Sequence, residues 1–96
     1  CPGTATVLPR IVESVGGRMT ILADGGIRDG VDVLKMLALG ADAVCIGRPI
    51  SIAAIGGGAA GVQLYLTQVR AQLQQAMLLT GCATIRDIGP RILFAA

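Results

Sequence analysis

The chain has 96 residues, of which 53% are apolar and only 15% are charged, a composition too apolar for a disordered polypeptide. Its eight Lys and Arg residues against six Asp and Glu residues give a net charge of +2, which is too small for the clustered basic face that nucleic acid requires, so we expect no nucleic-acid partner. A chain of this length forms one domain at most, and its excess of apolar residues indicates that a partner covers part of its surface.

The apolar residues of 5–15 recur at helical spacing and two glycines follow them, which predicts an amphipathic helix. Because Pro9 is tolerated only near a helix start, either Thr6 caps this helix or its first turn is irregular. Residues 19–23 then form a continuous apolar and β-branched run that stops at Asp24. This pattern is typical of a parallel strand buried on both faces.

Asp29 is a candidate N-cap, with Asp32 three residues later as in a capping box, for a helix that ends at Gly40. Residues 43–46 repeat the strand pattern, and Pro49 suits the first turn of a short third helix. The right-handed crossover rule predicts that the two strands lie parallel in one sheet. Strands that are apolar on both faces need neighbours on both edges, which indicates an excerpt of a larger fold.

The longest predicted helix covers residues 59–80, and Thr84 with Asp87 forms a second capping-box pattern for one turn at 85–88. The stretch 56–61 formally matches the dinucleotide motif GxGxxG, but it follows a helix instead of a strand, so we predict a flexible joint there.

Residues 49–69 carry no charge and reach the usual span length of about 20 residues. Three consecutive glycines would break such a helix in mid-membrane, so we expect no membrane span.

The chain contains no histidine, which removes imidazole both as a general base and as a metal ligand. Its three cysteines are widely spaced and form no CxxC pair: Cys1, Cys45 and Cys82. They predict reduced thiols and a cytoplasmic protein, with neither a disulfide framework nor a metal site. No secretory signal is expected, because no basic and apolar leader follows the first residue.

Two glycine–arginine elements follow the two predicted strands, at the strand ends where α/β folds place ligands. The first element comprises Asp24, Gly25, Gly26 and Arg28, and the second comprises Gly47 and Arg48. Glycines bring bare N–H groups close to an anion, arginines add charge-assisted hydrogen bonds, and each element precedes a helix N-terminus. Together they are typical of a phosphate site. The alternative interpretation, in which the glycines only form tight turns and the arginines are solvated, stays open.

The motifs resemble the C-terminal quarter of the FMN-dependent α-hydroxy-acid oxidases and dehydrogenases, which include glycolate oxidase, lactate oxidase and mandelate dehydrogenase. They are, in order, Asp24–Gly30 with Asp32–Lys35, Ala38–Ala41, Ile46–Pro49, and Thr80–Cys82 with Ile85 and Asp87–Ile88. The Asp-Gly-Gly stretch alone is also similar to inosine monophosphate dehydrogenase and to the type-2 isopentenyl diphosphate isomerase. The Gly-Arg-Pro and Gly-Cys motifs favour the hydroxy-acid enzymes.

The resemblance implies that residues 1–96 are the C-terminal part of one FMN-binding (β/α)8 TIM-barrel domain, contributing its last two βα units. It implies an oxidoreductase that converts a small 2-hydroxy acid, similar to lactate or glycolate, to the 2-oxo acid. The cofactor would be FMN, and its ribityl-phosphate would be held by Asp24, Gly25, Gly26, Arg28, Gly47 and Arg48. The family's Ser-Asn-His-Gly-Gly-Arg segment, with its catalytic histidine and substrate-binding arginine, would lie immediately before Cys1. We therefore expect no catalytic residue in this chain and no activity from it alone.

Two interpretations outside the enzyme class stay open. The chain could be a non-catalytic phosphate- or flavin-binding module that self-associates as a half-barrel, or a structural remnant without a ligand. For the enzyme we expect a homo-oligomer.

Overall fold

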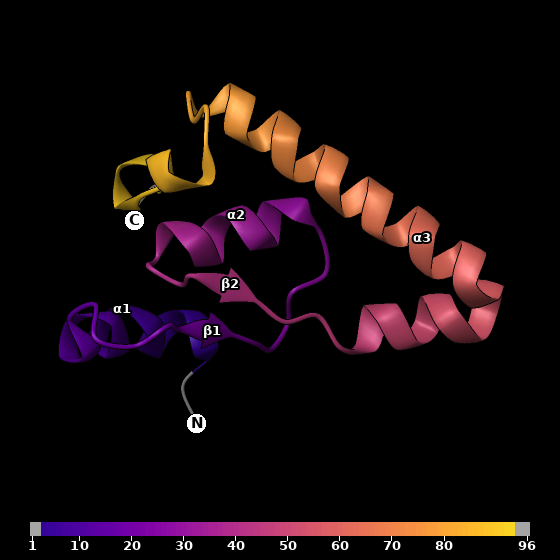
Figure 1. The fold of residues 1–96 in the computed structure, drawn as a ribbon, viewed down its shortest axis with the longest axis horizontal. Coiled ribbons are helices and arrows are strands. Elements are labelled where there is room, and N and C mark those ends of the chain that lie inside the picture. Colours follow the sequence, from indigo (N-terminus) through magenta and orange to yellow (C-terminus); the bar gives the residue numbers. More distant parts are fainter. Residues whose placement is uncertain (1–2, 94–96) are drawn as a thin grey trace.

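The structure is a computed structural model that describes residues 3–93. In chain order its elements are α1 (Thr4–Val15), β1 (Leu22–Ala23), α2 (Gly30–Ala38), β2 (Ala43–Val44), α3 (Arg48–Leu79), and two 3-10 turns, η1 (Ile85–Asp87) and η2 (Pro90–Ile92). The strands pair in parallel, with Leu22 opposite Ala43 and Ala23 opposite Val44. In Figure 1, α2 lies between this strand pair and the second part of α3. The predicted element order and the predicted parallel pairing are confirmed.

Helix α1 begins one turn earlier than a cap at Thr6 would place it. Its N-cap is Gly3, so the interpretation in which Thr6 caps the helix is wrong. The irregular first turn is the correct alternative, because the carbonyl of Gly3 accepts from the N–H groups of both Thr6 and Val7, at 3.0 and 3.4 Å. Pro9 lies inside the helix, where its missing N–H leaves one backbone carbonyl of the first turn without its usual partner.

Both strands are shorter than predicted, and only one of their faces is covered. In β1, Ala23 points toward the helices and is 2% exposed, whereas Leu22 is 63% exposed. Alternate strand residues point to opposite faces, and none of the residues 3–93 covers the face that carries Leu22. The prediction of burial on both faces is therefore wrong for the described chain, because such burial requires a second layer of structure.

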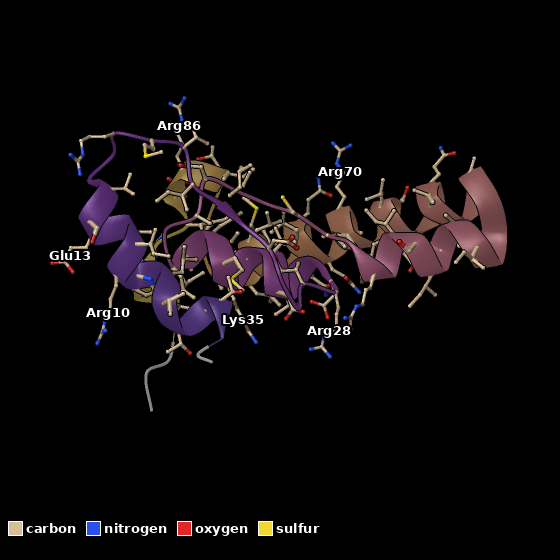
Figure 2. All side chains as sticks on the ribbon, turned by 90° about the horizontal axis from the view of Figure 1, so that it is seen from below. Arg10, Glu13, Arg28, Lys35, Arg70 and Arg86 are labelled. Carbon is tan, nitrogen blue, oxygen red and sulfur yellow. The ribbon has the colours of Figure 1, made fainter. Side chains whose placement is uncertain are left out.

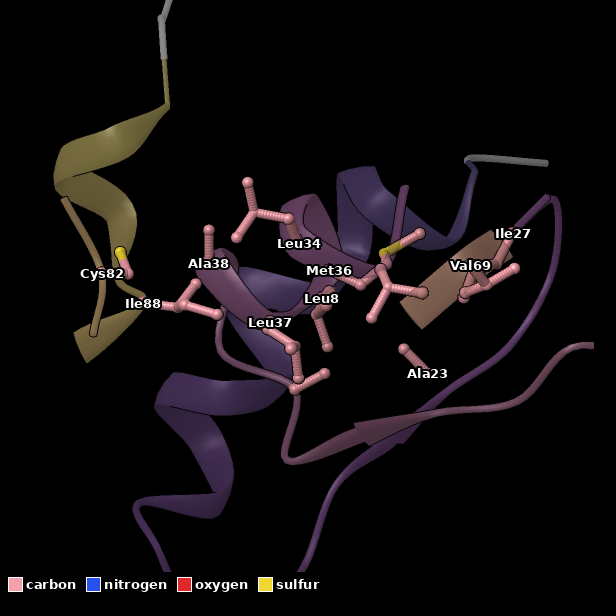
Figure 3. Close-up of a cluster of buried hydrophobic side chains, with 12 residues drawn as sticks. Leu8, Ala23, Ile27, Leu34, Met36, Leu37, Ala38, Val69, Cys82 and Ile88 are labelled. Carbon is pink, nitrogen blue, oxygen red and sulfur yellow. The ribbon is translucent and has the colours of Figure 1, made fainter. Parts of the chain in front are cut away.

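The buried core is centred on α2. Figure 3 shows the cluster: Leu34, Met36, Leu37 and Ala38 from α2 lie among Leu8 of α1, Ala23 of β1, Val69 of α3, and Cys82 and Ile88 near the C-terminus. The predicted N-cap of α2 is confirmed, since the Asp29 carboxylate accepts from the N–H of Asp32 at 2.9 Å. After α2 the chain turns at Gly40, whose φ of 115° favours glycine. A Cβ at this position would also collide with the side chain of Val12 in α1.

Helix α3 is two helical segments joined at Gly58, as the glycine stretch predicts. Gly58 has φ 59° and ψ −149°, a combination open essentially to glycine alone. Figure 1 shows the chain doubling back there, so that residues 59–79 pass over α2. By length and composition alone α3 qualifies as a membrane span, with a mean hydropathy of 1.4 over its most apolar window. The break at Gly58 interrupts that span.

The capping box after α3 is confirmed. Asp87 accepts from the backbone N–H of Thr84 at 2.9 Å, and the Thr84 side chain accepts from the backbone of Asp87. These bonds lower the pKa of Asp87, with the Thr84 N–H as the largest cause. The predicted helical turn at 85–88 is present as the 3-10 turn η1, which ends one residue earlier, at Asp87.

Candidate functional site

The six predicted site residues line one cavity. The cavity has a volume of about 550 Å³ and opens at the carboxyl ends of both strands. One wall is the loop after β1, Asp24–Arg28, and the other is Gly47–Pro49 at the start of α3, with Cys45 and Ile52 beside them. Because the strands are parallel and in register, their two following loops meet at one end of the sheet. The structure thus joins two motifs that are about twenty residues apart in the sequence.

The loop after β1 turns on two adjacent glycines. Gly25 has φ 103° and Gly26 has φ 72°, both in the region that other residues avoid. The Asp24 carboxylate accepts from the N–H of Gly25 at 2.7 Å. This bond uses one of the backbone donors that the sequence pattern assigns to an anion. Asp24 therefore braces its own loop as well as lining the cavity.

Arg28 is held at its backbone and reaches solvent with its guanidinium. The Asp32 carboxylate accepts from the Arg28 N–H at 3.1 Å and from Nε at 3.4 Å, while the Arg28 side chain is 77% exposed (Figure 2). Within residues 3–93 its two Nη groups have no protein partner. The predicted capping box of α2 is thus only half formed, because the Asp32 carboxylate binds Arg28 instead of the Asp29 N–H.

The second wall begins α3. Gly47 is its N-cap, and the Gly47 carbonyl accepts from the N–H groups of Ile50 and Ser51, each at 3.1 Å. Pro49 occupies the first turn, as predicted. Arg48 is exposed and makes no side-chain hydrogen bond or ion pair with any residue of the described range. The positive end of the α3 dipole and the Arg48 guanidinium both lie at this wall.

The first turn of α2 is less available to an anion than its sequence suggests. Three of its N–H groups already have protein partners: Gly30 N–H donates to Gln72 Oε1 at 3.0 Å, Asp32 N–H to Asp29, and Val33 N–H to the Asp29 carbonyl. Within residues 3–93 the Val31 N–H is the first-turn donor of α2 that has no hydrogen-bond partner, so α2 offers an anion fewer free donors than its sequence suggests.

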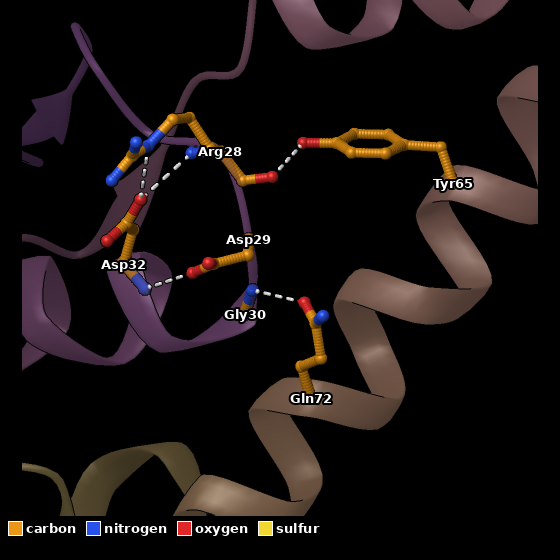
Figure 4. A network of polar contacts seen from close by, with 6 residues as sticks. All are labelled: Arg28, Asp29, Gly30, Asp32, Tyr65 and Gln72. Atoms are coloured by element: carbon orange, nitrogen blue, oxygen red, sulfur yellow. Dashed lines mark hydrogen bonds and ion pairs between the residues drawn. The ribbon is translucent and has the colours of Figure 1, made fainter.

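Two α3 side chains hold the first wall from behind. The Tyr65 hydroxyl donates to the carbonyl of Arg28, and Gln72 accepts from Gly30, as Figure 4 shows. Sequence reasoning missed both contacts, because each joins residues far apart in the chain. Burial raises the pKa of Tyr65, and the carboxylates of Asp29 and Asp32 raise it further, so the phenol stays protonated and able to donate.

Cys45 and Cys82 carry free thiols, Cys45 exposed at the cavity and Cys82 buried in the core. Cys1 lies outside the described residues.

The fold defines a βα portion of a (β/α)8 barrel, as predicted. The structure superposes on mandelate oxidase with benzoyl-formic acid at a TM-score of 0.84 and 43% identity, covering 85% of this chain and 24% of that one. A mandelate oxidase variant with a C4a-OH-FMN adduct gives a TM-score of 0.85 at 42% identity, covering 86% of this chain and 25% of the other.

The chain belongs to the FMN-dependent dehydrogenase family, whose model matches residues 1–95. It is 51% identical over 94 residues to a 2-hydroxyacid oxidase of Dictyostelium discoideum, covering 98% of this chain and 24% of the relative. It is 45% identical over 92 residues to an L-lactate oxidase of Roseobacter sp., covering 96% of this chain and 25% of the relative. The chain thus spans about a quarter of the length of the relatives it matches.

Proposed function

We propose that this chain is the phosphate-binding quarter of an FMN-dependent enzyme that oxidises a small 2-hydroxy acid to the 2-oxo acid. The observation that carries the proposal is the cavity at the strand ends, where Arg28 and Arg48 stand on opposite walls. Membership of an FMN-dependent family supports FMN as the anionic ligand.

The residues around the cavity fit a phosphate ester. Both arginines have donor groups without a protein partner in the described chain, and a dianion would satisfy them through charge-assisted hydrogen bonds. A Cβ added at Gly26 or Gly47 would meet nothing within 4 Å, so there is free space beside the backbone of both loops. The N-terminus of α3 adds a positive dipole end at the second wall.

The cavity residues have two distinct proposed tasks. Arg28, Arg48, Gly26 and Gly47 bind the phosphate, while the Asp24 carboxylate, an acceptor that would repel phosphate, accepts from a ribityl hydroxyl. Gly25 permits the turn that brings Asp24 to the cavity. When bound, FMN accepts the hydride equivalent from the substrate's α-carbon.

The remaining steps are assigned to other parts of the family's domain. This chain has no histidine and spans a quarter of its relatives' length, so we place the general base and the substrate-carboxylate site outside these residues. We further propose a cytoplasmic homo-oligomer without nucleic-acid or membrane partners. The free thiols support the cytoplasm, the low net charge supports the lack of a nucleic-acid partner, and the break in α3 supports the lack of a membrane partner.

Comparing FMN with riboflavin isolates the phosphate contribution, because the two flavins differ only by that group. We would measure both dissociation constants for the 96-residue chain, and for a chimera in which it replaces the matching quarter of the Dictyostelium oxidase. The proposal expects the chimera to prefer FMN by at least about 100-fold, from charge-assisted bonds of about 1.5–3 kcal/mol each, and to oxidise a small 2-hydroxy acid.

Three outcomes would contradict parts of the proposal. Equal affinity for the two flavins would remove the phosphate site. A chimera that prefers FMN and folds cooperatively but does not turn over would favour the non-catalytic flavin-binding module. Binding of neither flavin by a folded chimera would favour a structural remnant.

A further inference from the structure

Helix α3 contacts the cavity loops at two places. Its first turn forms the wall that carries Arg48, and after the break at Gly58 its second segment returns to the wall that carries Arg28. There Tyr65 donates to the Arg28 carbonyl and Gln72 accepts from the Gly30 N–H, one bond on each side of Asp29 (Figure 4). The two segments of α3 therefore contact the two walls that carry Arg28 and Arg48.

The fit between this segment and the loop is close. A Cβ on Gly30 would collide with the backbone of Val69 and Leu73 and with the Gln72 side chain. Beneath the contact, Ile27 and Val69 are 3% and 9% exposed. The second segment of α3 cannot approach the loop more closely, and moving it away would expose the buried Val69 side chain.

The loop needs such external support. It contains Gly25 and Gly26, and Gly30 follows at the start of α2; glycine loses more conformational freedom on ordering than any other residue. Asp32 restrains Arg28 from the α2 side through two hydrogen bonds. Tyr65 and Gln72 restrain the following two peptide groups from the α3 side.

We propose that Tyr65 and Gln72 are positioning residues, which set the Arg28 guanidinium opposite Arg48 at the separation that one phosphate group requires. This inference rests on the proposed function, because it assumes that both arginines bind the same phosphate. Neither residue touches the cofactor in this proposal. They act through the backbone of residues 28–30, and the bend at Gly58 determines where on the loop they act.

The test uses the chimera with Tyr65→Phe and with Gln72→Leu, and measures the ratio of the riboflavin to the FMN dissociation constant. Tyr65→Phe removes one hydroxyl and leaves the ring. The lost hydrogen bond should reduce the ratio about three- to tenfold in each variant. The matched control is Gln74→Leu, since Gln74 lies exposed on the same segment and makes no hydrogen bond within residues 3–93, and it should leave the ratio unchanged.

The ratio separates positioning from general loosening, because a loosened fold weakens both flavins together. If the parent chimera prefers FMN and both variants keep its ratio within twofold, the positioning role is refuted while the phosphate site stands. If the parent chimera shows no preference, the phosphate site itself fails and this inference fails with it. Should Tyr65→Phe not fold, Gln72→Leu against Gln74→Leu decides alone.

Discussion

The carboxylate of Asp42 accepts a hydrogen bond from the backbone N–H of Ile21 at 2.8 Å, and the Asp42 N–H donates back to the Ile21 carbonyl at 2.9 Å. This reciprocal pair lies just before both strands. It extends a ladder that has only two residues on each strand. Because the strand ends carry the cavity loops, the pair helps to align the two walls of the site.

Replacing Asp42 tests that alignment. Asp42→Ala leaves the Ile21 N–H without its acceptor and should lower the free energy of unfolding by about 1 kcal/mol. Asp42→Asn keeps a side-chain oxygen and should retain most of that stabilisation. Urea unfolding of both variants measures the difference, and equal losses would show that the contact contributes nothing specific.

Gly30 should not tolerate a side chain. Gly30→Ala places a methyl group against the backbone of Val69 and Leu73, which must separate α2 from α3. The expected loss is about 1–3 kcal/mol, as for other overpacked interiors. Unchanged thermal stability would mean that the two helices lie further apart than described.

Two neighbouring glycines of α3 should respond to alanine with opposite signs. Gly57 is helical and a Cβ there meets nothing within 4 Å, so Gly57→Ala should stabilise the chain by about 0.5–1 kcal/mol. Gly58→Ala forces alanine into a glycine-only conformation at a cost of about 1–3 kcal/mol. Calorimetry on the pair checks this, and a shift of the same sign in both would contradict the bend at Gly58.

The capping box at Asp87 predicts a pH dependence. Hydrogen bonds from Thr84 and Ala83 lower the pKa of Asp87 below its ordinary 3.8 in the folded chain. Between the two pKa values the unfolded chain binds more protons, so the stabilisation is complete above about pH 5 and is lost as the pH falls through the folded pKa. The melting temperature should therefore fall more steeply between pH 5 and pH 2 for the native chain than for Asp87→Asn. Parallel curves would show that the Asp87 carboxylate does not contribute to the pH dependence.

The charge and the shape of Arg48 should both matter for the phosphate. Arg48→Lys keeps the charge but loses the planar fork, so FMN affinity should fall less than in Arg48→Ala and still measurably. Riboflavin affinity should stay constant in both variants. A riboflavin affinity that falls in parallel would place Arg48 outside the phosphate site.

Local patterns predicted much of this fold. The Asp29 cap, the Thr84 and Asp87 capping box, and the joint at Gly58 all depend on residues within a few positions of one another, so the sequence displays them directly. The meeting of the two glycine–arginine elements was also predictable, because parallel strands place their following loops at one edge.

Features that depend on distant partners were not predictable in the same way. Whether Leu22 is covered depends on structure that packs from the other side of the sheet. The contact between Tyr65 and Arg28 depends on the angle at Gly58, which no periodicity encodes. Gln72 is one of several glutamines on its helix, and only the packing of Gly30 distinguishes it from the solvated ones.

The bend at Gly58 also limits how α3 can change in length. Each residue of an α-helix advances the chain by about 100° around the axis. An insertion or deletion of one residue between Gly58 and Tyr65 would therefore rotate the phenol to a different side of the helix, even with every other residue preserved. Seven added residues would restore its direction to within about 20° but carry it about 10 Å along the axis. The number of residues from 59 to 64 is therefore constrained more tightly than their identity, apart from Gly61, where a Cβ would meet the backbone carbonyl of Ala53.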